Sequence, residues 1–426
     1  MEATLDACES QGEIGAVARC LPRDVALATA ETAPKGLFSG VPILAKDLGS
    51  YARGLAPAGG STAIRARVRD PGTDGDFFAK LRRAGLIPMG LSTVPEFGFA
   101  LTSEPPGGPV ARNPFDRSRS PGGSSGGAAA AVAAGIVPMA HATDAAGSIR
   151  VPAACCGLWG LKPSRGATPM GPDFANHLMG IVGELVLTRS LRDLREVRQL
   201  FNRNLDASEP PAGCRVLLAI PDRCDRTQTR ATVDVAKLLQ VRGATIVESP
   251  APDTLGSAAH DLVGQILAVS LADWLSAADV PDDAISPLAA ANAARGRAMA
   301  PWDVFAVTRE IAKLTYAAAK LFVDADALLM PILSGPPPML GAFPTDHTDV
   351  TAHLAAMEAL APNATLANAA GLPALAIPVP TGNPIPTAVQ LVGPIGHDAR
   401  LLALAERICD DLAPVQYPAP IAGMPT

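Results

Sequence analysis

The chain has 426 residues, of which 48% are hydrophobic and 18% charged, enough apolar sequence to bury a large core. Its formal net charge is −6, so there is no basic field to attract nucleic acid or anionic lipid. The apolar runs are broken by Gly and Pro before the roughly 18 residues of a membrane helix, and the acidic N-terminus does not resemble a secretion signal, so we expect a cytoplasmic protein without a nucleic-acid or membrane partner.

Short apolar runs alternate with helical patterns along the chain, as in layered α/β proteins. The pattern predicts strands at 41–46, 86–92, 136–143, 214–221, 244–249, 325–332, 373–379 and 387–393. It predicts helices at 74–84, 126–135, 188–203, 229–241, 257–278, 302–323 and 398–412, and a loop over 334–349. Strand-like runs lie near both ends, and no linker divides the chain. We therefore predict one large α/β domain over 1–426, with a mixed central β-sheet covered by helices on both faces.

A first candidate nucleophile lies in the segment PGGSSGG at 121–127, just before an alanine-rich helix. Residues 122–126 fit the G-x-S-x-G pattern of a nucleophile elbow, which would make Ser124 the nucleophile. An elbow follows a buried strand, but the preceding segment NPFDRSRSP is polar and contains two prolines, which a central strand does not tolerate. An elbow also needs an acid and a histidine downstream, and none of the six histidines lies in a distinctive setting. The elbow is therefore the weaker interpretation.

A second candidate is Ser148, which ends the segment TDAAGS. The small side chains before it would let a substrate carbonyl approach the main chain, where successive N–H groups can converge on a developing oxyanion. A serine in such a place is a plausible nucleophile, but it requires a base. The candidate oxyanion donors are the backbone N–H groups of Ala145, Ala146, Gly147 and Ser148.

Several separate segments together resemble the amidase signature family. The two serine motifs are PGGSSGGAAAAVAAG and TDAAGSIRVPAACCGLWGLKPSRG. Ser148 in the second motif lies 24 residues after Ser124 in the first. GVPILAKDL is similar to the family's lysine-bearing strand, and NAAGLPALAIPVP with AVQLVGP is similar to its closing segment. The resemblance covers about 36–412, with a signature core at 36–200. The segments GFALTSEP and AAGSIRVPAACCGLWGLKPSRG are similar to the branch containing 6-aminohexanoate cyclic dimer hydrolases.

The resemblance implies a catalytic relay. Ser148 would be the nucleophile, Ser124 a bridging serine that follows a cis peptide bond from Gly123, and Lys46 the general base. This chemistry works without histidine, because a lysine at the end of an apolar strand loses solvation and its pKa falls toward neutrality. Supporting roles are expected for Ser125, as a structural hydroxyl, and for Asp144 and Arg150.

One departure from the family pattern concerns the residue before Gly147. The family more often has Gly-Gly-Ser, whereas this chain has Ala146-Gly147-Ser148. An alanine would be strained if its position required a positive φ. Because the other motifs are intact, we predict that Ala146 does not adopt a positive φ.

The resemblance implies an amidase that cleaves carbon–nitrogen bonds of linear amides other than peptide bonds, with no cofactor and no metal. We expect the pocket walls to come from 101–112, 170–181 and 257–345. The last of these segments belongs to helical and loop additions that span 251–345. These segments carry few charges, which favours a neutral, partly apolar small amide. The alternatives are a carbamate or ester hydrolase, a glutaminase-type subunit of an amidotransferase, and an inactive binding protein. A homodimer is an open expectation for a chain of this size.

Overall fold

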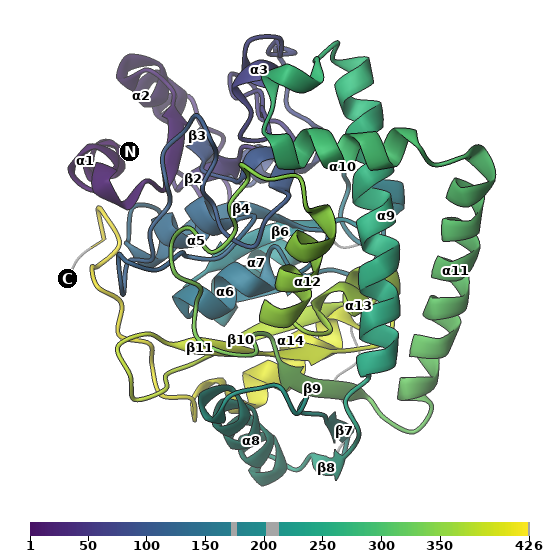
Figure 1. Ribbon diagram of the computed structural model, residues 1–426. Coiled ribbons are helices and arrows are strands. Elements are labelled where there is room, and N and C mark those ends of the chain that lie inside the picture. The colour runs from purple at the N-terminus through teal and green to yellow at the C-terminus, as the bar shows by residue number, and fades with distance from the viewer. Residues whose placement is uncertain (172–176, 202–212, 425–426) are drawn as a thin grey trace.

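The computed structural model describes residues 1–171, 177–201 and 213–424. Its centre is one sheet of 11 strands in the order β1-β3-β2-β4-β6-β5-β10-β11-β9-β7-β8 (Figure 1). The strands are β1 (Val17–Cys20), β2 (Pro42–Lys46), β3 (Ile87–Ser92), β4 (Met139–Asp144), β5 (Trp159–Lys162), β6 (Gly183–Thr188), β7 (Arg215–Leu218), β8 (Thr245–Glu248), β9 (Ala327–Pro331), β10 (Ala374–Val379) and β11 (Thr387–Val392). Strands from both ends of the chain share this sheet, so the fold is a single domain.

The sheet is mixed, as predicted. Strand β2 runs parallel to β3 and to β4, and β7 runs parallel to β8 and β9. The strands between these two groups pair in the antiparallel sense, from β4 through β6, β5, β10 and β11 to β9. All eight predicted strands are present. The sequence analysis does not predict β1, β5 and β6, since β1 ends in Arg-Cys, β5 contains a glycine and β6 begins with Gly-Glu.

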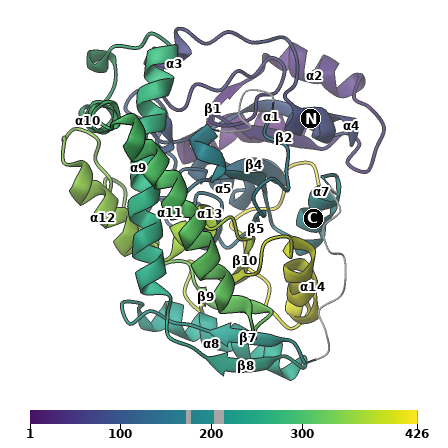
Figure 2. The same cartoon turned by 90° about the vertical axis from the view of Figure 1, so that its right-hand side faces the viewer.

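Helices cover both faces of the sheet. They are α1 (Glu2–Ser10), α2 (Arg23–Glu31), α3 (Thr62–Arg65), α4 (Asp76–Arg83), α5 (Gly126–Ala133), α6 (Arg150–Cys156), α7 (Leu191–Gln199), α8 (Arg226–Val241), α9 (Asp253–Ala277), α10 (Pro287–Arg297), α11 (Pro301–Ala319), α12 (Val350–Leu360), α13 (Ala364–Ala369) and α14 (Asp398–Cys409). In Figure 2, α7 and α14 lie on one side of the sheet, and α9, α10 and α12 lie on the other.

All seven predicted helices are present. The helix predicted at 188–203 begins at Leu191, and residues 202–203 lie outside the described residues. The missed helices include α6, α10, α12 and α13, which are short or rich in alanine and carry a weak amphipathic pattern.

One helix corrects the expectation that no apolar segment reaches the length of a membrane span. Helix α9 has 25 residues and a mean hydropathy of 1.3 over its most apolar window, so it meets the criterion of length and composition. However, 56% of that window is buried inside the protein, where α9 packs against α10, α11 and α13. The apolar character of α9 is therefore accounted for by the core of this fold.

Candidate active site

The strand topology brings a lysine and two serines to one place. Strands β2 and β4 are parallel neighbours, so Lys46 at the end of β2 lies close to Thr143 near the end of β4. Lys46 is completely buried. Its Nζ lies 2.8 Å from Ser124 Oγ, 2.8 Å from Thr143 Oγ1 and 3.3 Å from the Thr143 carbonyl oxygen. The structure therefore brings the predicted base and the predicted bridging serine into a hydrogen bond.

This arrangement suits a neutral amine at Lys46. A neutral amine has two N–H donors and one lone pair. The two oxygen atoms of Thr143 can accept the two donors, which leaves the lone pair for the Ser124 hydroxyl. Burial lowers the pKa of Lys46 to about 7, against the opposing charges of Asp144 and Glu184. Near neutral pH, a substantial fraction of Lys46 is therefore able to accept a proton.

Thr143 was missed by the sequence reasoning. In the sequence it is one of several small polar residues in an apolar strand, and its hydroxyl contacts Lys46 only because β2 and β4 are adjacent and parallel. Its carbonyl oxygen also accepts a hydrogen bond from Ser125 Oγ at 3.2 Å. The Ser125 hydroxyl is thus directed toward the backbone of β4.

The glycines around Ser124 allow the loop to pack against neighbouring backbone. The Gly123–Ser124 peptide bond is cis, and Gly122 has a φ of +84°. A Cβ atom on Gly123 would lie 2.3 Å from the Thr102 carbonyl oxygen, and one on Gly127 would lie 2.3 Å from the Thr93 nitrogen. Side chains at these two positions would push this segment away from the neighbouring backbone, and Ser124 away from Lys46.

Ser148 lies in the turn between β4 and α6, and this turn is organised by Asp144. The Asp144 carboxylate accepts hydrogen bonds from the N–H groups of Gly147 at 2.7 Å and Ile149 at 3.2 Å. The positive φ of this turn falls on Gly147, at +104°, and Ala146 is not among the positive-φ residues. The alanine that replaces the usual glycine is therefore unstrained, as predicted.

The predicted set of oxyanion donors needs one correction. The Gly147 N–H is occupied by Asp144, so it is not available to a substrate. Within the described part of the chain, the N–H groups of Ala145, Ala146 and Ser148 donate no hydrogen bond. These three residues line the same cavity as Ser124.

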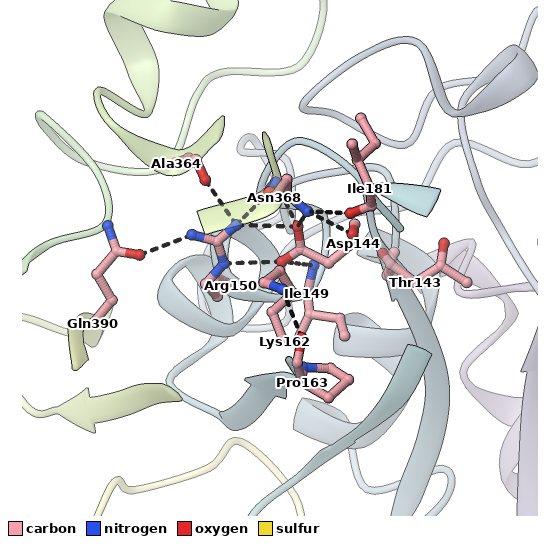
Figure 3. Close-up of polar contacts among 12 residues, drawn as sticks. Thr143, Asp144, Ile149, Arg150, Lys162, Pro163, Ile181, Ala364, Asn368 and Gln390 are labelled. Atoms are coloured by element: carbon pink, nitrogen blue, oxygen red, sulfur yellow. Dashed lines mark hydrogen bonds and ion pairs between the residues drawn. The ribbon is translucent and has the colours of Figure 1, made fainter. Parts of the chain in front are cut away.

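Asp144 is held by a buried arginine. Arg150 Nε and Nη2 lie 3.0 and 3.1 Å from the two carboxylate oxygens of Asp144 (Figure 3). The same guanidinium donates to Gln390 Oε1 at 2.8 Å, to Asn368 Oδ1 at 2.7 Å and to the Ala364 carbonyl oxygen at 2.8 Å. Burial opposes ionisation of Asp144, but the charge and hydrogen bonds of Arg150 outweigh it and lower the pKa of Asp144 to about 2.

The serines open into a cavity with a largely apolar wall. Among the described residues, none that lines the cavity is charged, and only part of the wall comes from the expected segments. Of the expected segment 257–345, helices α9 and α10 contribute lining residues. Of the expected segment 170–181, Leu178 lines the cavity, and 172–176 lie outside the described residues. No lining residue comes from 101–112. The apolar wall consists mainly of Phe97, Phe99, Leu267, Leu271, Trp274 and Met357.

Comparisons with known proteins assign the family. The model of the amidase family matches residues 1–402. A Mycobacterium leprae protein, AmiC, which is named only provisionally as an amidase, is 32% identical over 404 residues, or 88% of this chain and 83% of that protein. The 6-aminohexanoate-cyclic-dimer hydrolase of Paenarthrobacter ureafaciens is 40% identical over 161 residues, or 37% of this chain and 33% of that protein. A solved structure of 6-aminohexanoate cyclic dimer hydrolase superimposes with a TM-score of 0.87 at 27% identity, covering 96% of this chain and 92% of that one.

The chain therefore belongs to the amidase signature family, and the resemblance noted in the sequence is confirmed. It is an amidase-family hydrolase, an enzyme that cleaves the C–N bond of amides.

The Arg150 network predicts a stability effect. Replacing Arg150 with Met would leave the Asp144 carboxylate buried without its countercharge, so the free energy of unfolding should fall by about 3–5 kcal/mol. Chemical denaturation measures this change. Arg195→Met is the control, since it breaks an exposed ion pair with Glu406 and should cost no more than about 1 kcal/mol. Equal denaturation midpoints for the two variants would contradict the role assigned to Arg150.

Proposed function

We propose that this chain hydrolyses small, neutral, partly apolar amides through a Ser148–Ser124–Lys46 relay and a covalent acyl-enzyme. The observation that carries the proposal is the 2.8 Å hydrogen bond between the buried Lys46 amine and Ser124, next to a cavity that both serines line. A lysine kept neutral by burial is a competent general base, and the bridging serine connects it to the nucleophile.

In the first half-reaction, Ser148 Oγ forms a bond to the carbonyl carbon of the substrate. Its proton passes to Ser124 Oγ, and the Ser124 proton passes to Lys46 Nζ. The oxyanion that develops is held by the free N–H groups of Ala145, Ala146 and Ser148, and losing one such donor typically costs about 10²–10³ in rate. The C–N bond then breaks, and the leaving amine takes a proton back from Lys46 through Ser124.

In the second half-reaction, water attacks the ester formed on Ser148. The water proton passes through Ser124 to Lys46, and the same path returns a proton to Ser148 Oγ as the acid is released. The relay ends as it began, with a neutral lysine and two protonated serines, so no cofactor is required by this sequence of steps.

The residues that the structure describes in the cavity lining carry no charge, which supports a neutral substrate. Glutamine would bring an α-ammonium and an α-carboxylate, and burying unpaired charges is costly. This feature favours the independent amidase over a glutaminase-type subunit, and esters or carbamates remain the alternatives for the same machinery. The net charge of −6 supports the further proposal that the enzyme has no nucleic-acid or membrane partner. A cytoplasmic location is part of the same proposal and rests on the composition of the N-terminal segment. A homodimer stays a prediction.

A fluorophosphonate probe tests the relay, because it forms a stable adduct with an activated serine. We expect peptide mass spectrometry to find the adduct on Ser148, and Ser148→Ala to abolish it. Lys46→Met should slow labelling by at least about 10²-fold, the usual contribution of a general base.

The matched control is Lys162→Met. Lys162 is also completely buried, and burial lowers its pKa to about 7 as well, but its Nζ donates to the Pro163 carbonyl oxygen and contacts neither serine. The charge of Lys162 also acts on Asp144, but Arg150 still pairs with that carboxylate, so this variant should label at close to the original rate. An adduct on Ser124 would restore the nucleophile elbow, and equal slowing by both lysine variants would refute a specific base role for Lys46.

The pH dependence of activity has a definite sign. Only the neutral form of Lys46 accepts a proton, so kcat/KM should rise with pH through about 7 and should fall about tenfold per unit at lower pH. A panel of simple anilides assayed across pH measures this limb. The pH at which kcat/KM rises should be the same in Lys162→Met as in the wild type. A rising limb above pH 9 would show that burial does not neutralise Lys46.

A further inference from the structure

One polar side chain in the cavity wall has no hydrogen-bond partner in the described part of the protein. Asn292 lies on α10 and is only 1% exposed, and neither its Nδ2 nor its Oδ1 meets a partner. The other buried residues of this helix are Leu288, Ala289, Ala293 and Gly296, so Asn292 is the one polar member of an apolar stripe. An unpaired buried amide is destabilising and is rare in native proteins, which points to a ligand that pairs with it.

The chemistry of Asn292 narrows the choice of ligand. Its side chain offers an N–H₂ donor group and a carbonyl acceptor side by side. A second carboxamide presents the complementary acceptor and donor, so it can satisfy both sides at once. A ketone, an ether or an alkyl group would leave at least one side unpaired. A charged group would find no countercharge among the described lining residues, since none of them is charged.

The two cavities on this side of the protein indicate which part of the substrate Asn292 faces. A larger cavity of about 790 Å³ shares Leu48, Leu178, Ser270 and Trp274 with the catalytic cavity. The leaving amine must depart before water attacks the acyl-enzyme, and the larger cavity gives it space to do so. Asn292 lines the catalytic cavity and not the larger one. It is therefore placed toward the acyl part, which stays bound to Ser148.

We infer that Asn292 determines substrate specificity by hydrogen-bonding a second, uncharged carboxamide on the acyl part of the substrate. The preferred substrates are then amides of short acyl chains that end in a carboxamide. This inference rests on the proposed function, because it assumes that the acyl group is attached to Ser148.

A pair of substrates of matched shape tests the inference. Succinamic acid anilide carries the terminal carboxamide, and isocaproic acid anilide replaces its oxygen and nitrogen with two methyl groups. Malonamic and glutaramic anilides cover shorter and longer chains. At the best chain length, wild-type protein should favour the carboxamide over its apolar counterpart in kcat/KM. Asn292→Leu, an apolar residue of similar shape, should reduce that ratio by roughly ten- to a hundredfold.

The control is Ser61→Ala. Ser61 is also a buried residue whose hydroxyl has no partner among the described residues, but it lines neither cavity, so the ratio should not change. Where turnover is slow, the same compounds can be compared by how well they protect Ser148 against the fluorophosphonate probe. The ratio of their dissociation constants then replaces the ratio of kcat/KM. Asn292→Leu should melt no lower than wild type, because it removes an unpaired polar group. If it does not fold, Asn292→Ala replaces it.

The outcomes separate the inference from the proposed function. If Ser148 is labelled but the ratio does not respond to Asn292, or if wild type shows no preference at any chain length, the inference is wrong and the amidase proposal stands. An Asn292 that only held a water molecule would give this result. If Ser148 is neither labelled nor protected, the proposed function itself fails.

Discussion

The burial of the Lys46 amine is the constraint on which the rest of the site depends. A lysine at the end of a central strand cannot extend its amine to water, so it loses much of its preference for the charged state. The surroundings provide acceptors for two N–H groups, both on Thr143, and a hydroxyl for the lone pair, on Ser124. The close-packed glycines fix Ser124 at that distance. The parallel pairing of β2 and β4 thus sets the protonation state that the proposed chemistry needs.

A second constraint fixes the turn whose N–H groups we propose as the oxyanion donors. The carboxylate of Asp144 takes up the N–H groups of Gly147 and Ile149, which fixes the turn that carries Ser148. Within the described residues, the N–H groups of Ala145, Ala146 and Ser148 are left without an acceptor. Arg150 keeps Asp144 ionised in the interior. The contacts of Lys46 therefore set its protonation state, and the contacts of Asp144 set the conformation of the turn that carries Ser148.

The sequence predicts the residues at the centre of this site better than it predicts the residues that surround them. Lys46, Ser124 and Ser148 lie in motifs whose residue types and spacing are distinctive, and the longer apolar runs gave eight of the strands. The role of Thr143 depends on the pairing of two strands almost a hundred residues apart, and that of Gly147 on a hydrogen bond within a turn. In the sequence, Asn292 is one polar residue in an alanine-rich helix. Its lack of a hydrogen-bond partner among the described residues is visible only in the folded chain, where α10 is packed. Contacts of this kind depend on tertiary structure, and no local pattern encodes them.

The most direct test of the central claim is a titration of the lysine side chains by NMR, with lysine isotope-labelled at Cε. The seven lysines of the chain give a small set of resonances, and Lys46→Met and Lys162→Met assign the two buried ones. The account predicts that the Lys46 resonance titrates near pH 7, far below an exposed lysine at about 10.4. A Lys46 resonance that titrates with the exposed lysines would contradict it, because the amine would then be charged at neutral pH and unable to act as the base.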